Sequence, residues 1–287
     1  MSARNTVPPR TARWSQESAP RRFADLDGAA FPAFAPGTVW LVGAGPGAPG
    51  LLTLLAYHGL AHADVVVHDA LVGSGILDFV RPGARLVHAG KRGGKPSAAQ
   101  ADITEALIEA AREGARVLRL KGGDPFMFGR GGEECQALAA AGIPFRVVPG
   151  VSSGLGGLAY AGLPVTHREV NQCVTFLTGH DLTGALPNAI DWATVAKGSP
   201  VLVMYMAARH LPGIAARLLE AGRDGDEPVA VVANATLPEQ EVVRLTLAEA
   251  AEPRDLPTPA VVVLGRSVAL AETLDWWDAA ASRGLLG

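Results

Sequence analysis

Short apolar runs rich in β-branched residues alternate with helical patterns from Thr38 to Val148. The runs predict strands at 38–43, 65–68, 85–89, 116–120 and 145–148, with helices between them at 51–61, 74–80, 98–113 and 132–141. Such alternation is typical of βαβ units around a parallel sheet. The helix over 98–113 has capping-box spacing from Ser97 to Gln100 at its start, and Gly114 is expected to end it.

The pattern changes after Val165 to strands with fewer helices between them. These strands are predicted at 173–178, 201–205, 229–233, 242–246 and 260–264. We therefore expect α/β architecture in two domains, an N-terminal parallel-sheet domain over 38–150 and a C-terminal mixed-sheet domain over 151–280. The glycine-rich stretch 150–164 is the candidate hinge or interface between them.

Residues 1–37 are predicted to form a flexible N-terminal tail. They hold five arginines and three acidic residues, with no apolar run of the kind found in a secretory signal. The uncharged stretch 147–166 is about as long as a membrane span. Its many glycines and its two prolines instead predict a buried, tightly turning segment, so no membrane partner is expected.

Composition sets limits on the function. A chain of 287 residues with 48% hydrophobic and 18% charged residues can bury a full core, and its length suggests about two domains. The net charge of −3 lacks the positive field that nucleic-acid binding usually needs. Cys135 and Cys173 stand far apart without CxxC spacing, which predicts no zinc site and no disulfide framework. We expect a cytoplasmic protein.

Unusual residues follow the carboxyl end of every strand predicted in the first half. They are the loop at 43–47, Asp69, the segment 90–92, the segment 121–126 and the segment 149–153. The carboxyl ends of parallel strands lie on one edge of an open sheet, where ligands bind. Five segments that are distant in sequence are therefore expected to meet at one crevice.

The glycine-rich loop has more than one interpretation. Gly43, Gly45 and Ala48 fit the loose dinucleotide pattern G-x-G-x-x-G/A. Pro46 and Pro49 remove backbone donors that would hold a pyrophosphate, which favours another adenosine ligand. A purely structural turn also remains open.

The charged residues near these loops also have structural alternatives. Lys91 could be a solvated rim charge. Asp69 could cap a turn, and Asp124 could be an Asx-turn residue. Glu133 and Glu134 open a predicted helix, where carboxylates interact favourably with the helix dipole.

Several motifs together resemble a known family. They are GAGPG at 43–47, DALV at 69–72, GKR at 90–92, VLRLKGGDPFMFGRGGEE at 117–134, AYAGLPVTHR at 159–168 and TGH at 178–180. This set resembles the uroporphyrinogen-III C-methyltransferases of the tetrapyrrole methylase superfamily, over about residues 39–276. The resemblance implies a two-domain α/β fold and a homodimer with S-adenosylmethionine in the interdomain cleft. It also implies methylation of uroporphyrinogen III at ring carbons 2 and 7 to give precorrin-2, an early step toward sirohaem and cobalamin.

The resemblance assigns roles to individual positions. Asp69 matches the family's proposed proton acceptor and Lys91 its proposed proton donor. The positions that match the cofactor-lining residues of the family are Pro46, Gly122, Gly123, Asp124, Met127, Ser152, Ser153, Met206 and Ala235. The polycarboxylate substrate needs cations, for which Lys91, Arg92, Arg130, His167 and Arg168 are the candidates. A sulfonium methyl donor is already activated, so no metal is expected.

The chain departs from the family pattern at three places. Ser152 stands where threonine is expected, Ala235 stands where glycine is expected, and the arginine-rich tail is not part of the pattern. No dehydrogenase-chelatase half precedes the methyltransferase motifs, so a fused sirohaem synthase is not expected. Two alternatives remain at this point: a methyltransferase acting on a later precorrin, and a non-catalytic module that binds adenosine.

Overall fold

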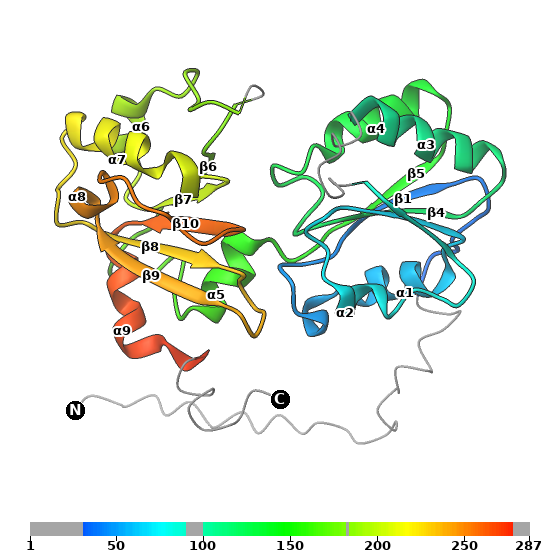
Figure 1. Ribbon diagram of the computed structural model, residues 1–287, viewed down its shortest axis with the longest axis horizontal. Helices are drawn as coiled ribbons and strands as arrows, with labels where there is room; N and C mark the ends of the chain where they lie inside the picture. The colour runs from blue at the N-terminus through cyan, green and yellow to red at the C-terminus, as the bar shows by residue number, and fades with distance from the viewer. Residues whose placement is uncertain (1–30, 90–99, 182–183, 278–287) are drawn as a thin grey trace, which may run out of the picture. The chain divides into compact units, whose positions relative to one another are not determined.

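The computed structural model describes residues 31–89, 100–181 and 184–277 (Figure 1). By its contacts the chain forms two units, residues 1–33 and residues 34–287. Both β-sheets belong to the unit that begins at Phe34. Most of the predicted tail and the capping box at Ser97 lie outside the described residues.

The first sheet is entirely parallel, as the sequence predicts. Its strands are β1 (Val39–Gly43), β2 (Val65–His68), β3 (Arg85–His88), β4 (Val117–Lys121) and β5 (Phe145–Val148), in the order β3-β2-β4-β1-β5. The strand β1 lies between β4 and β5, and β4 lies between β1 and β2. The carboxyl ends of all five strands therefore share one edge of the sheet.

Helices cover both faces of this sheet. They are α1 (Leu54–His62), α2 (Ser74–Leu77), α3 (Gln100–Arg112) and α4 (Gly131–Ala140). Figure 1 shows α1 and α2 on one face and α3 and α4 on the other. The helix expected from residue 51 starts later, because Thr53 caps α1 by accepting a hydrogen bond from the Ala56 amide; a 3-10 turn, η2 (Pro49–Leu51), precedes it.

The second sheet is mixed, which confirms the predicted fold class. Its strands are β6 (Thr175–Thr178), β7 (Leu202–Tyr205), β8 (Pro228–Ala233), β9 (Glu241–Thr246) and β10 (Ala260–Leu264), in the order β6-β7-β10-β8-β9. The strands β6 and β7 pair in parallel, and the other three pairs are antiparallel. The exact domain boundaries at 150 and 280 stay a prediction.

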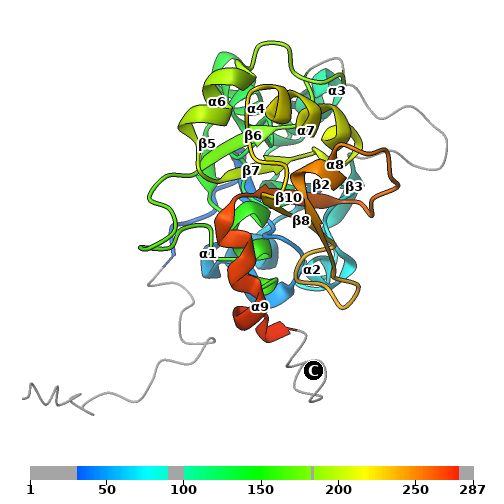
Figure 2. The same cartoon turned by 90° about the vertical axis from the view of Figure 1, so that its left-hand side faces the viewer.

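Short helices also cover this sheet on both faces. The helices α6 (Trp192–Gly198), α7 (Leu211–Glu220) and α8 (Leu247–Ala250) pack on one side of it. The segments η3 (Ser153–Gly157), α5 (Leu158–Tyr160), η5 (Arg266–Leu270) and α9 (Ala271–Leu274) pack on the other. In Figure 2 the half of the molecule that holds this sheet faces the viewer, with α6 and α7 above the sheet and α9 below it. A short 3-10 turn, η4 (Ala208–His210), leads into α7.

The uncharged glycine-rich stretch packs tightly against the second sheet. A Cβ on Gly154 would collide with the Tyr205 hydroxyl, and a Cβ on Gly157 would lie 2.8 Å from the Cβ of Ala235. Glycine is therefore required there by close approach. Among the residues that the structure describes, none of the helices combines the length and the apolar character that crossing a bilayer requires.

The end of the predicted tail belongs to the folded core. Phe34 is 7% exposed and stacks on Trp40 with 4.3 Å between ring centroids. The Gly37 amide donates to the carbonyl of Ala115 at 3.1 Å. The expectation of a tail reaching residue 37 is corrected for these positions, because a single aromatic side chain anchors the backbone without any periodic pattern.

Phe34→Ala should therefore destabilise the fold by about 3 kcal/mol, since it removes a buried aromatic ring. The measurement is the urea midpoint, compared with that of Phe126→Ala. Phe126 is 61% exposed, and its truncation should change the free energy of unfolding by less than about 0.5 kcal/mol. Equal midpoints for the two variants would contradict the anchoring role of Phe34.

Candidate active site

A cavity of about 790 Å³ lies at the carboxyl edge of the first sheet. Its lining from that sheet is Gly45 and Pro46 after β1, Asp69 and Leu71 after β2, Ala89 after β3, residues 121–124 at the end of β4, and Ser152 and Ser153 after β5. The second sheet contributes Tyr205 and Met206 at the end of β7, Asn234 and Ala235 after β8, and residues 258–261 at β10. The predicted convergence is therefore confirmed for the segments after β1, β2, β4 and β5, while the segment 90–92 lies outside the described residues.

Three glycines let the loops after β1, β4 and β5 approach each other closely. A Cβ on Gly43 would lie 2.5 Å from the Cα of Gly150 and 2.6 Å from the carbonyl oxygen of Gly123. Gly45 and Gly123 also exchange backbone hydrogen bonds at 3.2 and 2.8 Å. The three loops thus form one packed unit at the floor of the cavity.

This packing contradicts the dinucleotide interpretation of the glycine-rich loop. The Ala44 amide donates to Lys121, the Gly45 amide to Gly123, and the Ala48 amide to the Thr236 hydroxyl at 2.9 Å. A pyrophosphate needs free amides at a helix start, but these amides are already bonded and α1 begins only at Leu54. The loop fits a ligand that approaches glycine backbone without phosphate groups.

Asp124 joins two of these loops. One carboxylate oxygen accepts from the Phe126 amide at 2.8 Å, which is the Asx turn predicted as an alternative. The other oxygen accepts from the Gly150 amide at 3.0 Å. Asp124 lines the cavity as well, so its carboxylate holds in place the backbone that a ligand would meet.

Asp124→Ala should raise the dissociation constant for S-adenosylmethionine about 10-fold to 150-fold, the range for one lost charge-assisted hydrogen bond. The reason is that the Gly150 loop loses its link to the β4 loop. Asp124→Asn retains an acceptor oxygen, so its dissociation constant should lie between those of the wild-type protein and Asp124→Ala. Titration calorimetry measures the dissociation constants of the wild-type protein and of both variants. Unchanged affinity in a folded Asp124→Ala variant would leave Asp124 only its role in the Asx turn.

Asp69 lies at the cavity beside a group of buried charges. Its Oδ1 accepts from Nη2 of Arg119 at 2.5 Å, and its side chain is 31% exposed. Arg119 also donates from Nε to Oε1 of Glu134 at 3.0 Å, and Nζ of Lys121 lies 3.0 Å from Oε2 of Glu134. Glu134 lies in the first turn of α4, as the helix-dipole interpretation requires, but it is 0% exposed and its carboxylate is also a buried ion-pair partner.

The pKa values of two groups beside Asp69 are shifted by this environment. Burial, and then the Arg119 guanidinium, lowers the pKa of the Lys121 ammonium. Burial also lowers the pKa of His68, whose Nδ1 lies 3.2 Å from the carbonyl oxygen of Asp69. Among the described residues, the cation in direct contact with the Asp69 carboxylate is the Arg119 guanidinium.

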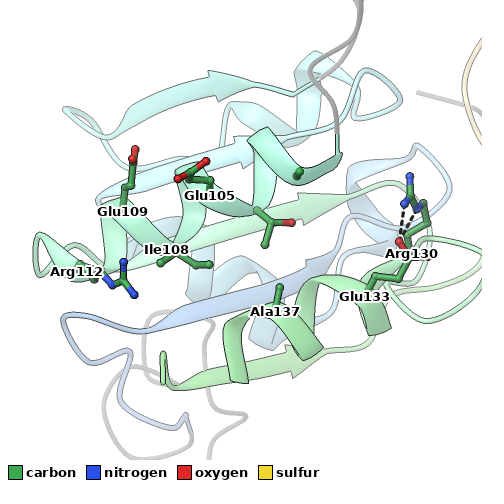
Figure 3. Close-up of a pocket in the computed structure, with 9 residues that line it drawn as sticks. Glu105, Ile108, Glu109, Arg112, Arg130, Glu133 and Ala137 are labelled. Carbon is green, nitrogen blue, oxygen red and sulfur yellow. Dashed lines mark hydrogen bonds and ion pairs between the residues drawn. The ribbon is translucent and has the colours of Figure 1, made fainter. Parts of the chain in front are cut away.

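Arg130 lies at the start of α4 in a left-handed conformation with φ +60°. Its Nε and Nη2 donate to Oε2 of Glu133 at 2.8 and 2.6 Å, and both side chains are about half exposed. Figure 3 shows this pair at one end of a second hollow of about 550 Å³ between α3 and α4, with Arg112 at the other end. Arg130 also lines the main cavity, so its guanidinium borders both spaces.

A tyrosine that sequence analysis did not single out supports the loop after β5. The Tyr205 hydroxyl accepts from the Gly154 amide at 3.0 Å and lies 2.6 Å from the Ser152 hydroxyl. Burial raises the pKa of Tyr205, which keeps its phenol protonated. Ser152, which stands where the family has threonine, is 5% exposed. Its hydroxyl therefore bonds to Tyr205 inside the protein.

Strained backbone gathers around the cavity. Five described residues other than glycine have positive φ, and four of them, Phe128, Arg130, Met206 and Asn234, line the cavity. Such strain is typical of binding and catalytic sites. Ala235 is not among the five, so the backbone at this position does not require the glycine that the family pattern has.

The structure brings most of the predicted site residues together. All the residues predicted to contact the cofactor line the cavity, and so do Asp69 and Arg130. His167 and Arg168 lie in the turn between α5 and β6 and are not part of the lining. Lys91 and Arg92 lie outside the described residues.

Sequence analysis missed the roles of Arg119 and Glu134. A signal was present, because Arg119 and Lys121 stand two residues apart in a run that otherwise reads as a strand buried on both faces. Charged side chains at such positions require partners. Glu134 gave no comparable signal, since carboxylates are common in the first turn of a helix.

Comparison with known proteins identifies the family. A family model described as Tetrapyrrole (Corrin/Porphyrin) Methylases matches residues 38–251, well over half of the chain. The chain belongs to the tetrapyrrole methylase family. This tetrapyrrole methylase is 58% identical over 260 residues to a uroporphyrinogen-III C-methyltransferase of Sinorhizobium sp, with 90% of this chain and 93% of the relative covered.

Solved structures and longer relatives agree with this membership. The crystal structure of uroporphyrin-III C-methyl transferase from Thermus thermophilus complexed with S-adenyl homocysteine has a TM-score of 0.72 and 41% identity, over 81% of this chain and 99% of the other. A cobalt precorrin-4 methyltransferase has a TM-score of 0.71 at 27% identity, over 83% and 98%. The siroheme synthase of Actinobacillus pleuropneumoniae is 48% identical over 84% of this chain, which spans only 49% of that relative's length.

The cavity fits S-adenosylmethionine, the co-substrate of this enzyme class. Its floor is glycine backbone whose amides are already bonded, and Met127, Met206 and Leu237 supply apolar lining. A ligand with an adenosine group and no phosphates suits such a surface. Within the described ranges, no three His, Cys, Asp or Glu side chains lie close enough together to hold a metal ion.

Proposed function

We propose that this chain is an S-adenosylmethionine-dependent uroporphyrinogen-III C-methyltransferase. Its 58% identity to an enzyme of that name over nearly the whole of both chains carries the proposal. The later-precorrin alternative has weaker support, since the cobalt precorrin-4 methyltransferase is only 27% identical. The reaction adds methyl groups to ring carbons 2 and 7 and gives precorrin-2, an early intermediate toward sirohaem and cobalamin.

The geometry supports one division of labour within the cavity. S-adenosylmethionine supplies a methyl group already activated on sulfonium, so the protein must place the pyrrole carbon in line with that group. The residues we assign to this placement are those of the glycine floor, with Pro46, Met127, Ser153, Met206 and Ala235 around it. Each methyl group added to the macrocycle is balanced by a proton that leaves it, and the Asp69 carboxylate is the proposed acceptor.

Substrate carboxylates need cations at the mouth of the cavity. Arg130 fits this role because it is half exposed and lines the cavity, and Arg209 is a second exposed cation of the same lining. Lys91 and Arg92 remain proposed on the family resemblance alone, with Lys91 as proton donor. His167 and Arg168 keep their proposed role on the same ground, although they lie outside the lining. The resemblance also supports a homodimer, and the cysteine pattern supports a cytoplasmic location.

The decisive experiment is anaerobic incubation of the protein with uroporphyrinogen III and labelled S-adenosylmethionine, with transferred methyl groups counted by mass. Two methyl groups per tetrapyrrole and two S-adenosylhomocysteine molecules are expected. Transfer only to a later precorrin would replace the proposed substrate. Binding of S-adenosylmethionine without transfer to either compound would identify a non-catalytic adenosine module instead.

Arg130→Ala should weaken uroporphyrinogen III binding, more steeply at low salt, while the affinity for S-adenosylmethionine holds. The matched control is Arg112→Ala, at the far end of the hollow in Figure 3 and outside the cavity lining, which should change neither affinity. Equilibrium binding of both ligands measures the difference. Loss of both ligands with a lower melting temperature would mean that Arg130 serves only as the structural partner of Glu133.

A further inference from the structure

Four charged side chains form a continuous chain from the protein interior to the cavity. Arg119 and Lys121 are 2% and 3% exposed, lie on the same face of β4 and both contact Glu134 of α4. Arg119 alone continues to Asp69, the one member of the chain that is substantially exposed. The two cations and two carboxylates balance in charge.

Stability is a weak explanation for this arrangement. Taking charges out of water costs several kcal/mol per ion, and well-packed apolar residues in place of a buried ion pair are often as stable or more stable. The position of the cluster is informative, because its exposed end is the carboxylate that we propose as proton acceptor. The cluster is thus better explained by what it does to Asp69.

The Arg119 guanidinium is fixed at every nitrogen. Its Nε donates to Glu134, and its Nη1 points at the carbonyl oxygens of Val67 and Leu120, both at 3.3 Å. Its Nη2 is left to hold Oδ1 of Asp69. A planar guanidinium bound in this way cannot turn without breaking several contacts at once.

We propose that Glu134 is a positioning residue for the proton acceptor. Its buried carboxylate orients Arg119 and offsets one of the two neighbouring positive charges, so it fixes the guanidinium that holds Asp69 and the balance of charge beside it. This inference rests on the proposed methyltransferase function. Within residues 31–89, 100–181 and 184–277, the charged and titratable groups that face Asp69 are Arg119 and Lys121 from β4 and His68 from β2, with His88 of β3 packed edge-on against His68 at 5.1 Å.

Removing the buried charge of Glu134 and removing that of Lys121 should shift the pH profile of kcat in opposite directions. Glu134→Gln leaves the cluster with a net positive charge, which favours the carboxylate form of Asp69 and makes it a weaker base. Lys121→Met leaves a net negative charge and has the reverse effect. The acid limb of the kcat profile should therefore move by about one pH unit to lower pH in the first variant and to higher pH in the second.

The experiment compares pH profiles of kcat for the wild-type protein, the two variants and one control. Glu227→Gln breaks a largely buried arginine pair, with Arg223, in the part of the chain between α7 and β8. It should lower the melting temperature and leave the pH profile in place. Affinity for S-adenosylmethionine, measured by calorimetry, should stay within about 2-fold in all variants, a change of less than 0.5 kcal/mol.

The inference is overturned if Glu134→Gln and Lys121→Met lose only stability, as the control does, and keep the wild-type pH profile. If Glu134→Gln does not fold, Lys121→Met decides alone, since Glu134 keeps its bond to Arg119 there. Wild-type protein that fails to methylate uroporphyrinogen III in this assay defeats the proposed function. If the wild-type enzyme is active and the acid limb of the kcat profile does not move in the variants, only the positioning role of Glu134 is disproved.

Discussion

Replacing Asp69 with asparagine is expected to lower kcat about 100-fold or more while both ligands still bind, because the variant keeps the shape of the side chain and loses the base. The amide oxygen of asparagine can still accept from Nη2 of Arg119, the contact that fixes Asp69 in the cavity. Single-turnover methyl transfer from labelled S-adenosylmethionine measures the rate. Calorimetry with each ligand measures binding separately.

Asp191→Asn is the matched control for this prediction. Asp191 caps α6 by accepting from the Thr194 amide at 3.1 Å, and it does not line the cavity. Asparagine caps helices about as well as aspartate, so this variant should retain rate and stability. Near-normal turnover in Asp69→Asn would remove Asp69 as proton acceptor, whatever its position in the cavity.

The convergence of loops on one cavity could be predicted from the sequence because it follows from strand direction alone. Once the runs around Val42, Val67 and Leu120 were identified as parallel strands, their carboxyl ends had to share an edge, and the residues after them had to meet there. The same logic placed Asp69 and Asp124 at the site. The side chains and amides that bond to Asp69 and Asp124 could not be predicted from strand direction.

Contacts between side chains distant in sequence could not be predicted in this way. Glu134 is exposed or buried according to how α4 rotates on the sheet, and the pattern at its N-terminus allowed both orientations. Tyr205 looked like an ordinary strand residue, although its hydroxyl holds the loop at Gly154. Phe34 was assigned to the tail because one aromatic residue gives no periodicity, yet it stacks on Trp40.

Gly150→Ala is expected to abolish measurable cofactor binding, or nearly so, because the new methyl group has no space. Its Cβ would overlap the carbonyl oxygen of Gly123 and lie 2.7 Å from the Cα of Gly43. Both of these contacts are with backbone atoms, so no neighbouring side chain can turn away to relieve them. Overpacking of this kind typically costs about 1–3 kcal/mol of stability, and here the loops after β1 and β4 must separate.

The same displacement weakens the hydrogen bond from the Gly150 amide to Asp124, so the floor of the cavity changes together with stability. Gly132→Ala is the matched control: Gly132 lies in α4 with open space around its Cα. Alanine there should stabilise the helix by up to about 1 kcal/mol. Thermal unfolding and calorimetry with S-adenosylmethionine report on both variants. If Gly150→Ala bound the co-substrate with unchanged affinity, the packed glycine floor could not be the surface that S-adenosylmethionine meets, and its binding site would have to lie elsewhere in the cavity.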